Sequence, residues 1–167
     1  MIMSLMKLPP ALVLVSAAVA ALAGALVAEY GFGLKPCELC LAQRVPYVAV
    51  LVLAGLALGL PLPANRRALL LALCALALAI DGGIAVYHVG VEQHWWTGPS
   101  ACTSGGPQAG SAGQLKALLA GPVAMPVQCD AVPWSLFGVS MAGYNIAYAW
   151  ACAAFAAWAA GWTRRRG

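Results

Sequence analysis

The chain has 167 residues, of which 63% are hydrophobic and only 8% are charged, and its formal net charge is +4. Soluble domains carry about 25% charged residues, so this composition argues against a soluble monomer. The same numbers exclude intrinsic disorder, which needs low hydrophobicity and high charge. Three of the positive charges form one run, Arg164, Arg165 and Arg166, which bears on membrane orientation and not on nucleic acid.

The gaps between the few charges are long enough to cross a membrane. A helix needs about 20 apolar residues for this, and four stretches meet that length, near 10–29, 43–62, 68–88 and 136–161. Backbone groups in lipid must be satisfied within the segment, so all four should be helices. The sequence therefore predicts an all-α fold, an integral membrane four-helix bundle that forms a single domain over 1–167.

The first apolar stretch has a second interpretation, a cleaved signal peptide with Lys7 before it. Its apolar part is longer than the roughly 7–15 residues of a signal peptide. We therefore expect it to be retained as a membrane anchor.

Basic residues predict the orientation of the bundle. Four spans place both termini on one side, and that side carries six of the nine basic residues. These six are Lys7, Arg66, Arg67, Arg164, Arg165 and Arg166. Cytoplasmic loops are enriched in Lys and Arg, so we expect both termini in the cytoplasm. Two loops, about 30–42 and 89–135, then face the other side.

The longer outer loop is rich in Gly, Ser and Pro over 98–113. Leu115, Leu118 and Leu119 follow at helical spacing beside Lys116. This spacing predicts a short interfacial helix over 114–119, with a partly ordered loop as the alternative.

Four of the six cysteines lie in the outer loops, two in each loop. Cys37 and Cys40 are in the first loop, and Cys102 and Cys129 are in the second. Disulfides persist outside the cytoplasm and rarely within it, so this distribution indicates thiol redox chemistry or structural disulfides. The other two cysteines, at 74 and 152, fall inside predicted spans and receive no role.

Cys37 and Cys40 form a CxxC motif at the start of the second span. Backbone N–H groups and the helix dipole favour a thiolate there, and such pairs cycle between dithiol and disulfide. Arg44 lies one turn after Cys40, on the same face. A structural disulfide would close too short a loop to stabilise much. A zinc site commonly has two tight pairs, and Cys102 and Cys129 are far apart in the sequence.

The electron acceptor that fits a CxxC at a membrane surface is a lipid-soluble quinone, because the chain has no nucleotide-binding fingerprint and no haem or iron–sulfur ligand set. Arg44 is a candidate to bind a quinone oxygen. His88, near the outer end of the third span, is a second candidate, with a satisfied interfacial histidine as the alternative. Asp81 lies deeper in the same span, where an acid is by default a functional candidate. We expect a structural role instead, with Asp81 either protonated or paired with a polar side chain of another span.

Two segments resemble the DsbB family, the bacterial disulfide bond formation protein B. Residues 36–44 read PCELCLAQR, which is similar to the first outer loop of that family. Residues 129–145 read CDAVPWSLFGVSMAGYN, which is similar to its run into the last helix. With four spans, two outer loops and a cysteine pair in each loop, the resemblance covers nearly the whole chain.

The resemblance implies an inner-membrane thiol:quinone oxidoreductase with periplasmic loops. Such an enzyme reoxidises a DsbA-like thioredoxin-fold oxidase and passes two electrons to ubiquinone or menaquinone, the route that keeps a bacterial periplasm oxidising. By motif, Cys102 would form the mixed disulfide with the partner, and Cys129 would resolve it and communicate with Cys37. Cys40 would face the quinone beside Arg44. His88 corresponds loosely to a family histidine near the quinone.

Two other functions stay open at this point. One is a quinone-linked enzyme similar to vitamin K epoxide reductase, although that family carries its CxxC late in the bundle. The other is a non-enzymatic membrane scaffold that binds a metal through the outer thiolates. The absence of a second tight CxxC favours the oxidoreductase, for which no metal is expected.

Overall fold

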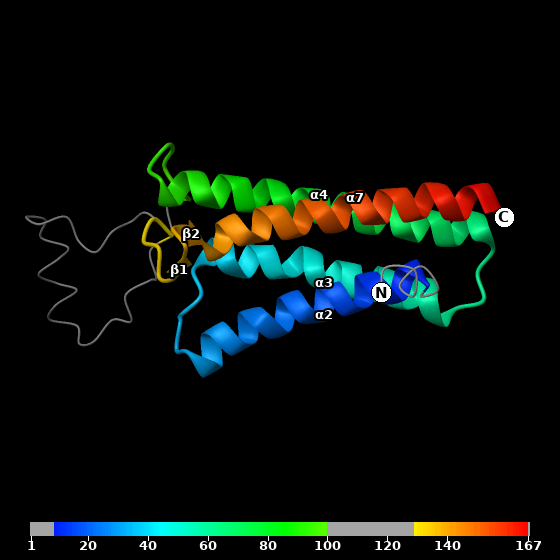
Figure 1. The fold of residues 1–167 in the computed structure, drawn as a ribbon, viewed down its shortest axis with the longest axis horizontal. Helices are drawn as coiled ribbons and strands as arrows, with labels where there is room; N and C mark the ends of the chain where they lie inside the picture. The colour runs from blue at the N-terminus through cyan, green and yellow to red at the C-terminus, as the bar shows by residue number, and fades with distance from the viewer. Residues whose placement is uncertain (1–8, 100–128, 167) are drawn as a thin grey trace, which may run out of the picture.

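The computed structural model describes residues 9–99 and 129–166, and it is almost entirely helical there (Figure 1). The long helices are α2 (Pro10–Leu26), α3 (Glu38–Gly59), α4 (Ala64–Glu92) and α7 (Met141–Arg166). A single π-helical segment, η1 (Val27–Gly31), continues α2 at its C-terminal end.

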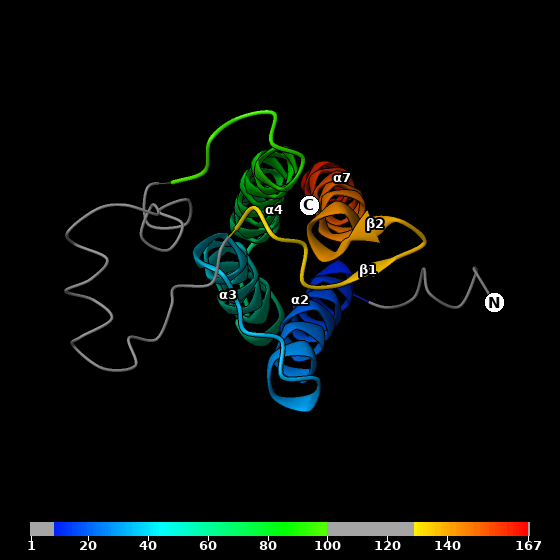
Figure 2. The ribbon, with the colours of Figure 1, turned by 90° about the vertical axis from the view of Figure 1, so that its left-hand side faces the viewer.

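The four helices run side by side in a bundle (Figures 1 and 2). In the end-on view of Figure 2, α4 lies next to α7 and α3 lies next to α2. A hollow at one end is lined by Pro9, Ala64 and Arg166, so the starts of α2 and α4 meet the end of α7 there. The opposite end carries the start of α3 and the end of α4, and we call it the thiol end.

Three helices of the described residues are long and apolar enough to cross a membrane. They are Pro10–Gly31, which joins α2 and η1, Glu38–Gly59 and Ala64–Glu92. The fourth helix, α7, is comparably long but contains Gly, Asn, Tyr and Trp among its alanines. The all-α membrane bundle expected from the sequence is therefore supported, with three apolar helices and a fourth packed against them.

The helix α3 begins at Glu38, inside the CxxC motif and earlier than the expected span near 43–62. Cys37 caps the helix, and its sulfur accepts a hydrogen bond from the backbone N–H of Cys40. A cap of this kind satisfies one of the N–H groups that have no partner within the first turn. Both cysteines are thereby held at a helix N-terminus.

The last helix begins later than the sequence indicates, at Met141 instead of near residue 136. A two-stranded hairpin precedes it, in which β1 (Ser135–Leu136) pairs with β2 (Val139–Ser140). Phe137 and Gly138 form its turn with φ values of 51° and 79°. Positive φ at both central residues is the geometry of a tight hairpin turn, which a right-handed helix cannot contain. The expected interfacial helix over 114–119 lies outside the described residues.

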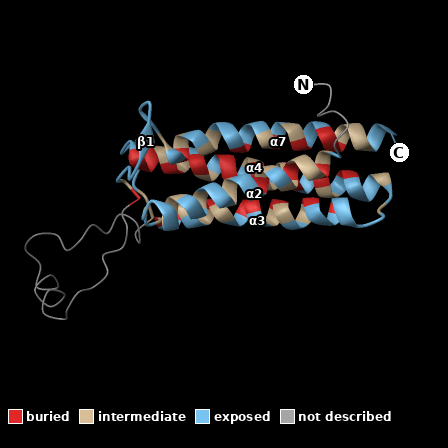
Figure 3. Cartoon of the chain, turned by 60° about the horizontal axis from the view of Figure 1, so that its bottom comes forward, coloured by how far each residue is buried: buried red, intermediate tan, exposed pale blue. Residues whose placement is uncertain are grey.

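The interior of the bundle is built largely from alanine and leucine. Buried residues of all four helices form one apolar cluster, which includes Leu14, Ala54, Leu71, Leu78 and Ala156. Figure 3 colours the buried residues red, and they alternate with intermediate and exposed residues along the helices. Small residues let helices in a membrane approach closely, and this packing holds the thiol end in place.

Candidate redox site

The two thiols of the CxxC motif are in direct contact at the start of α3. Both are free, and Cys37 Sγ donates a hydrogen bond to Cys40 Sγ over 2.8 Å. Cys37 is buried, whereas Cys40 is partly exposed. The hydrogen bond to Cys40 and then burial raise the pKa of the Cys37 thiol. Cys40 is therefore the acceptor of the pair, which is the part that a thiolate takes.

His88 of α4 reaches the same pair from the neighbouring helix. Its Nε2 lies 3.6 Å from Cys37 Sγ, and its Nδ1 lies 2.9 Å from Gln43 Nε2. The ring is buried, with 4% of its surface exposed. The structure thus brings together Cys37, Cys40 and His88, three of the residues that the sequence singles out.

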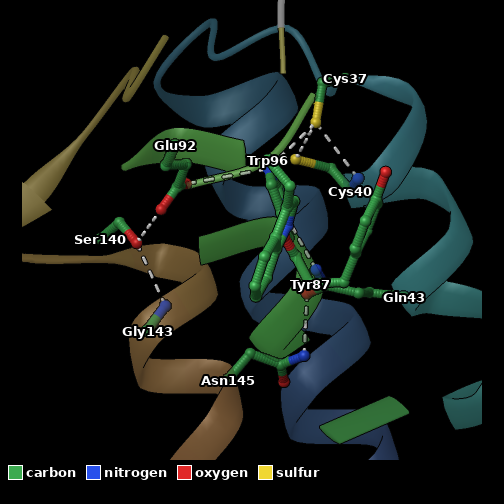
Figure 4. A network of polar contacts seen from close by, with 10 residues as sticks. Cys37, Cys40, Gln43, Tyr87, Glu92, Trp96, Ser140, Gly143 and Asn145 are labelled. Carbon is green, nitrogen blue, oxygen red and sulfur yellow. Dashed lines mark hydrogen bonds and ion pairs between the residues drawn. The ribbon is translucent and has the colours of Figure 1, made fainter. Parts of the chain in front are cut away.

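Glu92 is a buried carboxylate one turn beyond His88. Its Oε1 lies 3.8 Å from His88 Nε2, and its Oε2 accepts a hydrogen bond from Ser140 Oγ over 2.5 Å. Ser140 Oγ also accepts from the backbone N–H of Gly143, at the start of α7 (Figure 4). Burial of a carboxylate is costly unless it is hydrogen-bonded, and Ser140 supplies one such bond.

Asp81 is fully buried in α4, two turns before His88. Its Oδ2 accepts a hydrogen bond from Asn145 Nδ2 of α7 over 2.9 Å. The expected pairing with a polar side chain of another helix is therefore confirmed. Tyr47 OH donates to Asn145 Oδ1 over 2.6 Å, so α3 joins the same contact.

Arg44 forms an ion pair that the sequence pattern does not indicate. Its Nη1 donates to Glu29 Oε2 of η1 over 2.6 Å, and each side chain is about one-fifth exposed (22% and 21%). The π-helical turn extends the first helix far enough to place Glu29 opposite Arg44. Arg44 therefore stands near Cys40 with a carboxylate partner of its own.

A cavity of about 460 Å³ opens between the helices at the thiol end. Its polar lining includes Cys37, Cys40, Arg44 and His88, and most of the rest is apolar, with alanines of α2 and Met141 of α7. Small-molecule sites are commonly apolar clefts of about 300–1,000 Å³ with a few polar groups. The cavity thus has the size and lining of a site for a small, largely apolar molecule.

Cys129, which lies between α4 and β1, belongs to the same site. It is disulfide-bonded, and the other cysteines of the described residues are free. Cys129 is buried in one apolar cluster with Cys37, Leu39 and Val91, against which Cys40 and Tyr87 pack. The residue from the second loop and the CxxC motif therefore share a core. Cys102 lies outside the described residues.

Three atoms at this site also have the spacing of a metal site. Cys37 Sγ, Cys40 Sγ and one ring nitrogen of His88 all lie within 4.8 Å of one another. Sulfur and imidazole ligands are typical of zinc, which takes four ligands in structural sites. The arrangement can therefore hold a soft divalent ion or exchange disulfides, and these two uses compete for the same sulfurs.

Sequence reasoning missed Glu92, Ser140, Glu29 and the role of Asn145. A signal existed for Glu92, because Asp81, His88 and Glu92 lie seven and eleven positions along one helix and so share a face. No such signal existed for Ser140 or Glu29, since their partners come from other helices. Cys74 and Cys152, which received no role, lie within α4 and α7 away from the thiol pair.

Comparisons with known proteins point in one direction. The family model for disulfide bond formation protein DsbB matches residues 8–159. A protein named disulfide bond formation protein B from Acinetobacter baylyi is 30% identical over 139 residues, covering 81% of this chain and 80% of its own. One of the same name from Verminephrobacter eiseniae is 32% identical over 133 residues, covering 77% and 72%. No solved structure matches the chain.

Proposed function

The chain belongs to the DsbB family, and we propose that it uses its two outer cysteine pairs to pass electrons from a periplasmic dithiol oxidase to a membrane quinone. Membership makes it a multi-pass membrane oxidoreductase of disulfide bond formation. The quinone, the DsbA-like partner and the cysteine roles are the proposed parts.

The observation that carries the proposal is the shared location of three features. The free thiols of Cys37 and Cys40 touch, they border a cavity of about 460 Å³, and disulfide-bonded Cys129 is buried in the same cluster as Cys37. Thiol–disulfide exchange requires the sulfurs to meet through mixed disulfides. A dithiol beside both a disulfide and a cavity can exchange with one and be oxidised through the other.

We assign the outer cysteines in the order that the family motif implies. Cys102 accepts the attack of the partner's thiolate, and Cys129 resolves the mixed disulfide. The disulfide of Cys37 and Cys40 then reoxidises the second pair and becomes a dithiol. Each exchange forms one S–S bond and breaks another, so two electrons and two protons move from the partner to Cys37 and Cys40.

The residues around the cavity fit a quinone, ubiquinone or menaquinone. When bound, the quinone accepts the two electrons and two protons of the dithiol and becomes a quinol. Arg44 supplies a cation at the cavity wall, and His88 supplies a polar ring nitrogen. Groups of this kind stabilise negative charge that develops on oxygen in a site with little water. The alanines of α2 exclude water from the ring.

This function requires the thiol end to face the periplasm. The termini and the loop between α3 and α4, which carries Arg66 and Arg67, would then lie in the cytoplasm of a bacterial inner membrane. Cysteine-substitution labelling from outside intact spheroplasts tests this. A cysteine at Gln93 should react with an impermeant maleimide, and one at Asn65 should not.

The experiment that tests the function uses the purified full chain in nanodiscs. A reduced DsbA-like oxidase is added with a soluble ubiquinone or menaquinone analogue, and partner thiols and quinol are measured together. We expect one quinol for each partner disulfide. Oxidation of the partner without quinone consumption, or none at all, would contradict the proposal.

Trapping tests the order of the cysteines. Non-reducing gels of single variants should show the partner adduct with Cys129→Ser and lose it with Cys102→Ser. An adduct that survives Cys102→Ser would show that another cysteine receives the partner.

A second function is favoured by the cluster of Cys37, Cys40 and His88, whose ligand atoms have the spacing of a metal site. A metal-binding scaffold would hold one zinc per chain in the native protein, and this zinc would survive mild oxidant. The oxidoreductase predicts instead that quinone reversibly converts the two thiols to a disulfide.

A further inference from the structure

An unbroken chain of hydrogen bonds connects the middle of the bundle to the thiol end. Asp81 Oδ2 accepts from Asn145 Nδ2 over 2.9 Å, and the same nitrogen donates to Gln43 Oε1 over 2.9 Å. Gln43 Nε2 then contacts His88 Nδ1 over 2.9 Å. The four side chains come from three helices, and Figure 4 shows Gln43 and Asn145 facing one another between them.

Asp81, at the deep end of these hydrogen bonds, determines which group of each following side chain donates and which accepts. As a carboxylate, Asp81 can only accept, so the oxygen that faces Asn145 has no proton to give. Asn145 must therefore present its amide nitrogen, and Tyr47 OH donates to the oxygen of the same amide. Because that nitrogen also faces Gln43, Gln43 must present its oxygen there.

The orientation of Gln43 in turn determines which ring nitrogen of His88 carries the proton. With its oxygen turned to Asn145, Gln43 presents its amide nitrogen to His88. Nδ1 of His88 must then accept a hydrogen bond, so it carries no proton. A neutral imidazole has one N–H, which is left at Nε2. Imidazolium is excluded by the same bond, because both of its nitrogens donate.

Nε2 is the atom that faces the thiol site. It lies 3.6 Å from Cys37 Sγ and 3.8 Å from Glu92 Oε1. Ser140 occupies the other oxygen of Glu92, which leaves Oε1 turned to the histidine. The proton on Nε2 thus stands between the sulfur and the carboxylate.

We infer that Asp81, Asn145 and Gln43 are positioning residues, which hold His88 in the tautomer whose Nε2–H donates to the sulfur of Cys37. His88 is then a hydrogen-bond donor to Cys37 and not its base. The donor stabilises Cys37 whenever that sulfur carries negative charge during exchange. This last consequence rests on the proposed function, whereas the tautomer itself does not.

The test of the tautomer is nitrogen NMR of the full chain in detergent. The chain has two histidines, so labelling with 15N-histidine gives two rings, and a His94→Gln variant identifies the signals of His88. We expect a bare Nδ1 and a protonated Nε2 in the reduced native protein. A protonated Nδ1 would overturn the inference without any variant.

Two substitutions test the positioning residues. A carboxylate in Gln43→Glu can only accept, so Nδ1 of His88 should gain a proton. Asp81→Asn can face Asn145 with oxygen or nitrogen, so both tautomers should appear. Cys74→Ala is the matched control, because Cys74 is buried in α4 like Asp81 but takes no part in these hydrogen bonds. It should leave Nδ1 of His88 without a proton. An unchanged single tautomer in Asp81→Asn would remove Asp81 from the mechanism.

Alkylation of Cys37 distinguishes a donor from a base. Position-resolved mass spectrometry follows iodoacetamide labelling of the reduced chain, without quinone or partner. Loss of a hydrogen bond to a charged group in His88→Leu should slow labelling of Cys37 about tenfold. His88→Gln keeps an N–H donor and should restore most of the rate. Equal slowing by both variants would indicate a base and overturn the donor role. The NMR and alkylation measurements use neither quinone nor partner. A chain that failed to reduce quinone would therefore still test the tautomer and the donor role of His88.

Discussion

The thiol end and the opposite half of the bundle are built from the same four helices but from different side chains. Around the thiols, buried polar groups of α3, α4 and α7 bond to one another across helices. In the opposite half, the buried positions are almost all alanine and leucine, such as Ala57, Leu71 and Ala159. One half therefore carries the buried polar groups, and the other holds the helices together.

The difference teaches how a protein with few charges keeps a polar site in place. A buried polar group without a partner costs free energy, so each of these groups requires a partner at a defined distance. The small-residue packing of the other half sets those distances, because it fixes the rotation and spacing of the helices. Substitutions should therefore affect reaction at the thiol end and stability in the other half.

The largest effect is expected at the partly exposed thiol. Cys40→Ser should abolish quinone-dependent oxidation of the partner, because the first sulfur pair can no longer form a disulfide. The assay is partner oxidation in nanodiscs. Cys74→Ser, which removes a buried thiol of α4, is the control and should keep the native rate. Retained oxidation of the partner by Cys40→Ser would show that the reaction does not depend on the thiol end.

Leu71→Ala should have the opposite signature. Leu71 is fully buried in the apolar half, so its truncation should lower the free energy of unfolding by about 2–5 kcal/mol. Unfolding by SDS titration measures this loss. The oxidation rate per folded molecule should stay native, and a large fall in that rate would mean that the two halves are not separable.

Two adjacent glycines of α4 test how closely α4 and α7 pack against each other. A Cβ at Gly82 would lie 2.7 Å from the indole nitrogen of Trp150 of α7, whereas a Cβ at Gly83 would meet nothing within 4 Å. Gly82→Ala should therefore destabilise the bundle by about 1–3 kcal/mol through overpacking. Gly83→Ala should be neutral or slightly stabilising, since alanine favours helix. Equal effects in SDS titration would rule out this close approach.

The smallest effect concerns the cation at the cavity wall. Arg44→Gln should raise the KM for quinone about tenfold, the effect of losing one hydrogen bond from a charged donor. Glu29→Gln removes the partner of Arg44 and keeps its charge, so its KM should change less. The pair is compared by steady-state kinetics, and an unchanged KM in Arg44→Gln would exclude Arg44 from quinone binding.

The sequence predicted what depends on local pattern. Spacing of charges identified the apolar helices, and the CxxC motif at the start of the second apolar stretch located the thiols at the start of a helix. The cost of an acid in lipid predicted a partner for Asp81, and the structure supplies Asn145. These inferences need only hydrophobicity and the properties of a helix terminus.

The sequence did not predict what depends on how the helices are rotated against one another. Gln43 and Asn145 are 102 positions apart, and their contact exists only because α3 and α7 present those faces to each other. The Glu29–Arg44 pair depends on a π-helical turn, which carries no clear sequence signature. The hairpin before α7 was missed because Phe137 adopts a positive φ that few bulky residues do.

The most direct test of the central claim follows one turnover at the thiol end. The reduced full chain is mixed with one equivalent of a quinone analogue, quenched with acid and alkylated, and the peptide that carries Cys37 and Cys40 is weighed by mass spectrometry. We expect one Cys37–Cys40 disulfide for each quinol formed, with Cys74 and Cys152 still alkylated. Quinol formed while Cys37 and Cys40 remain alkylated would contradict the central claim.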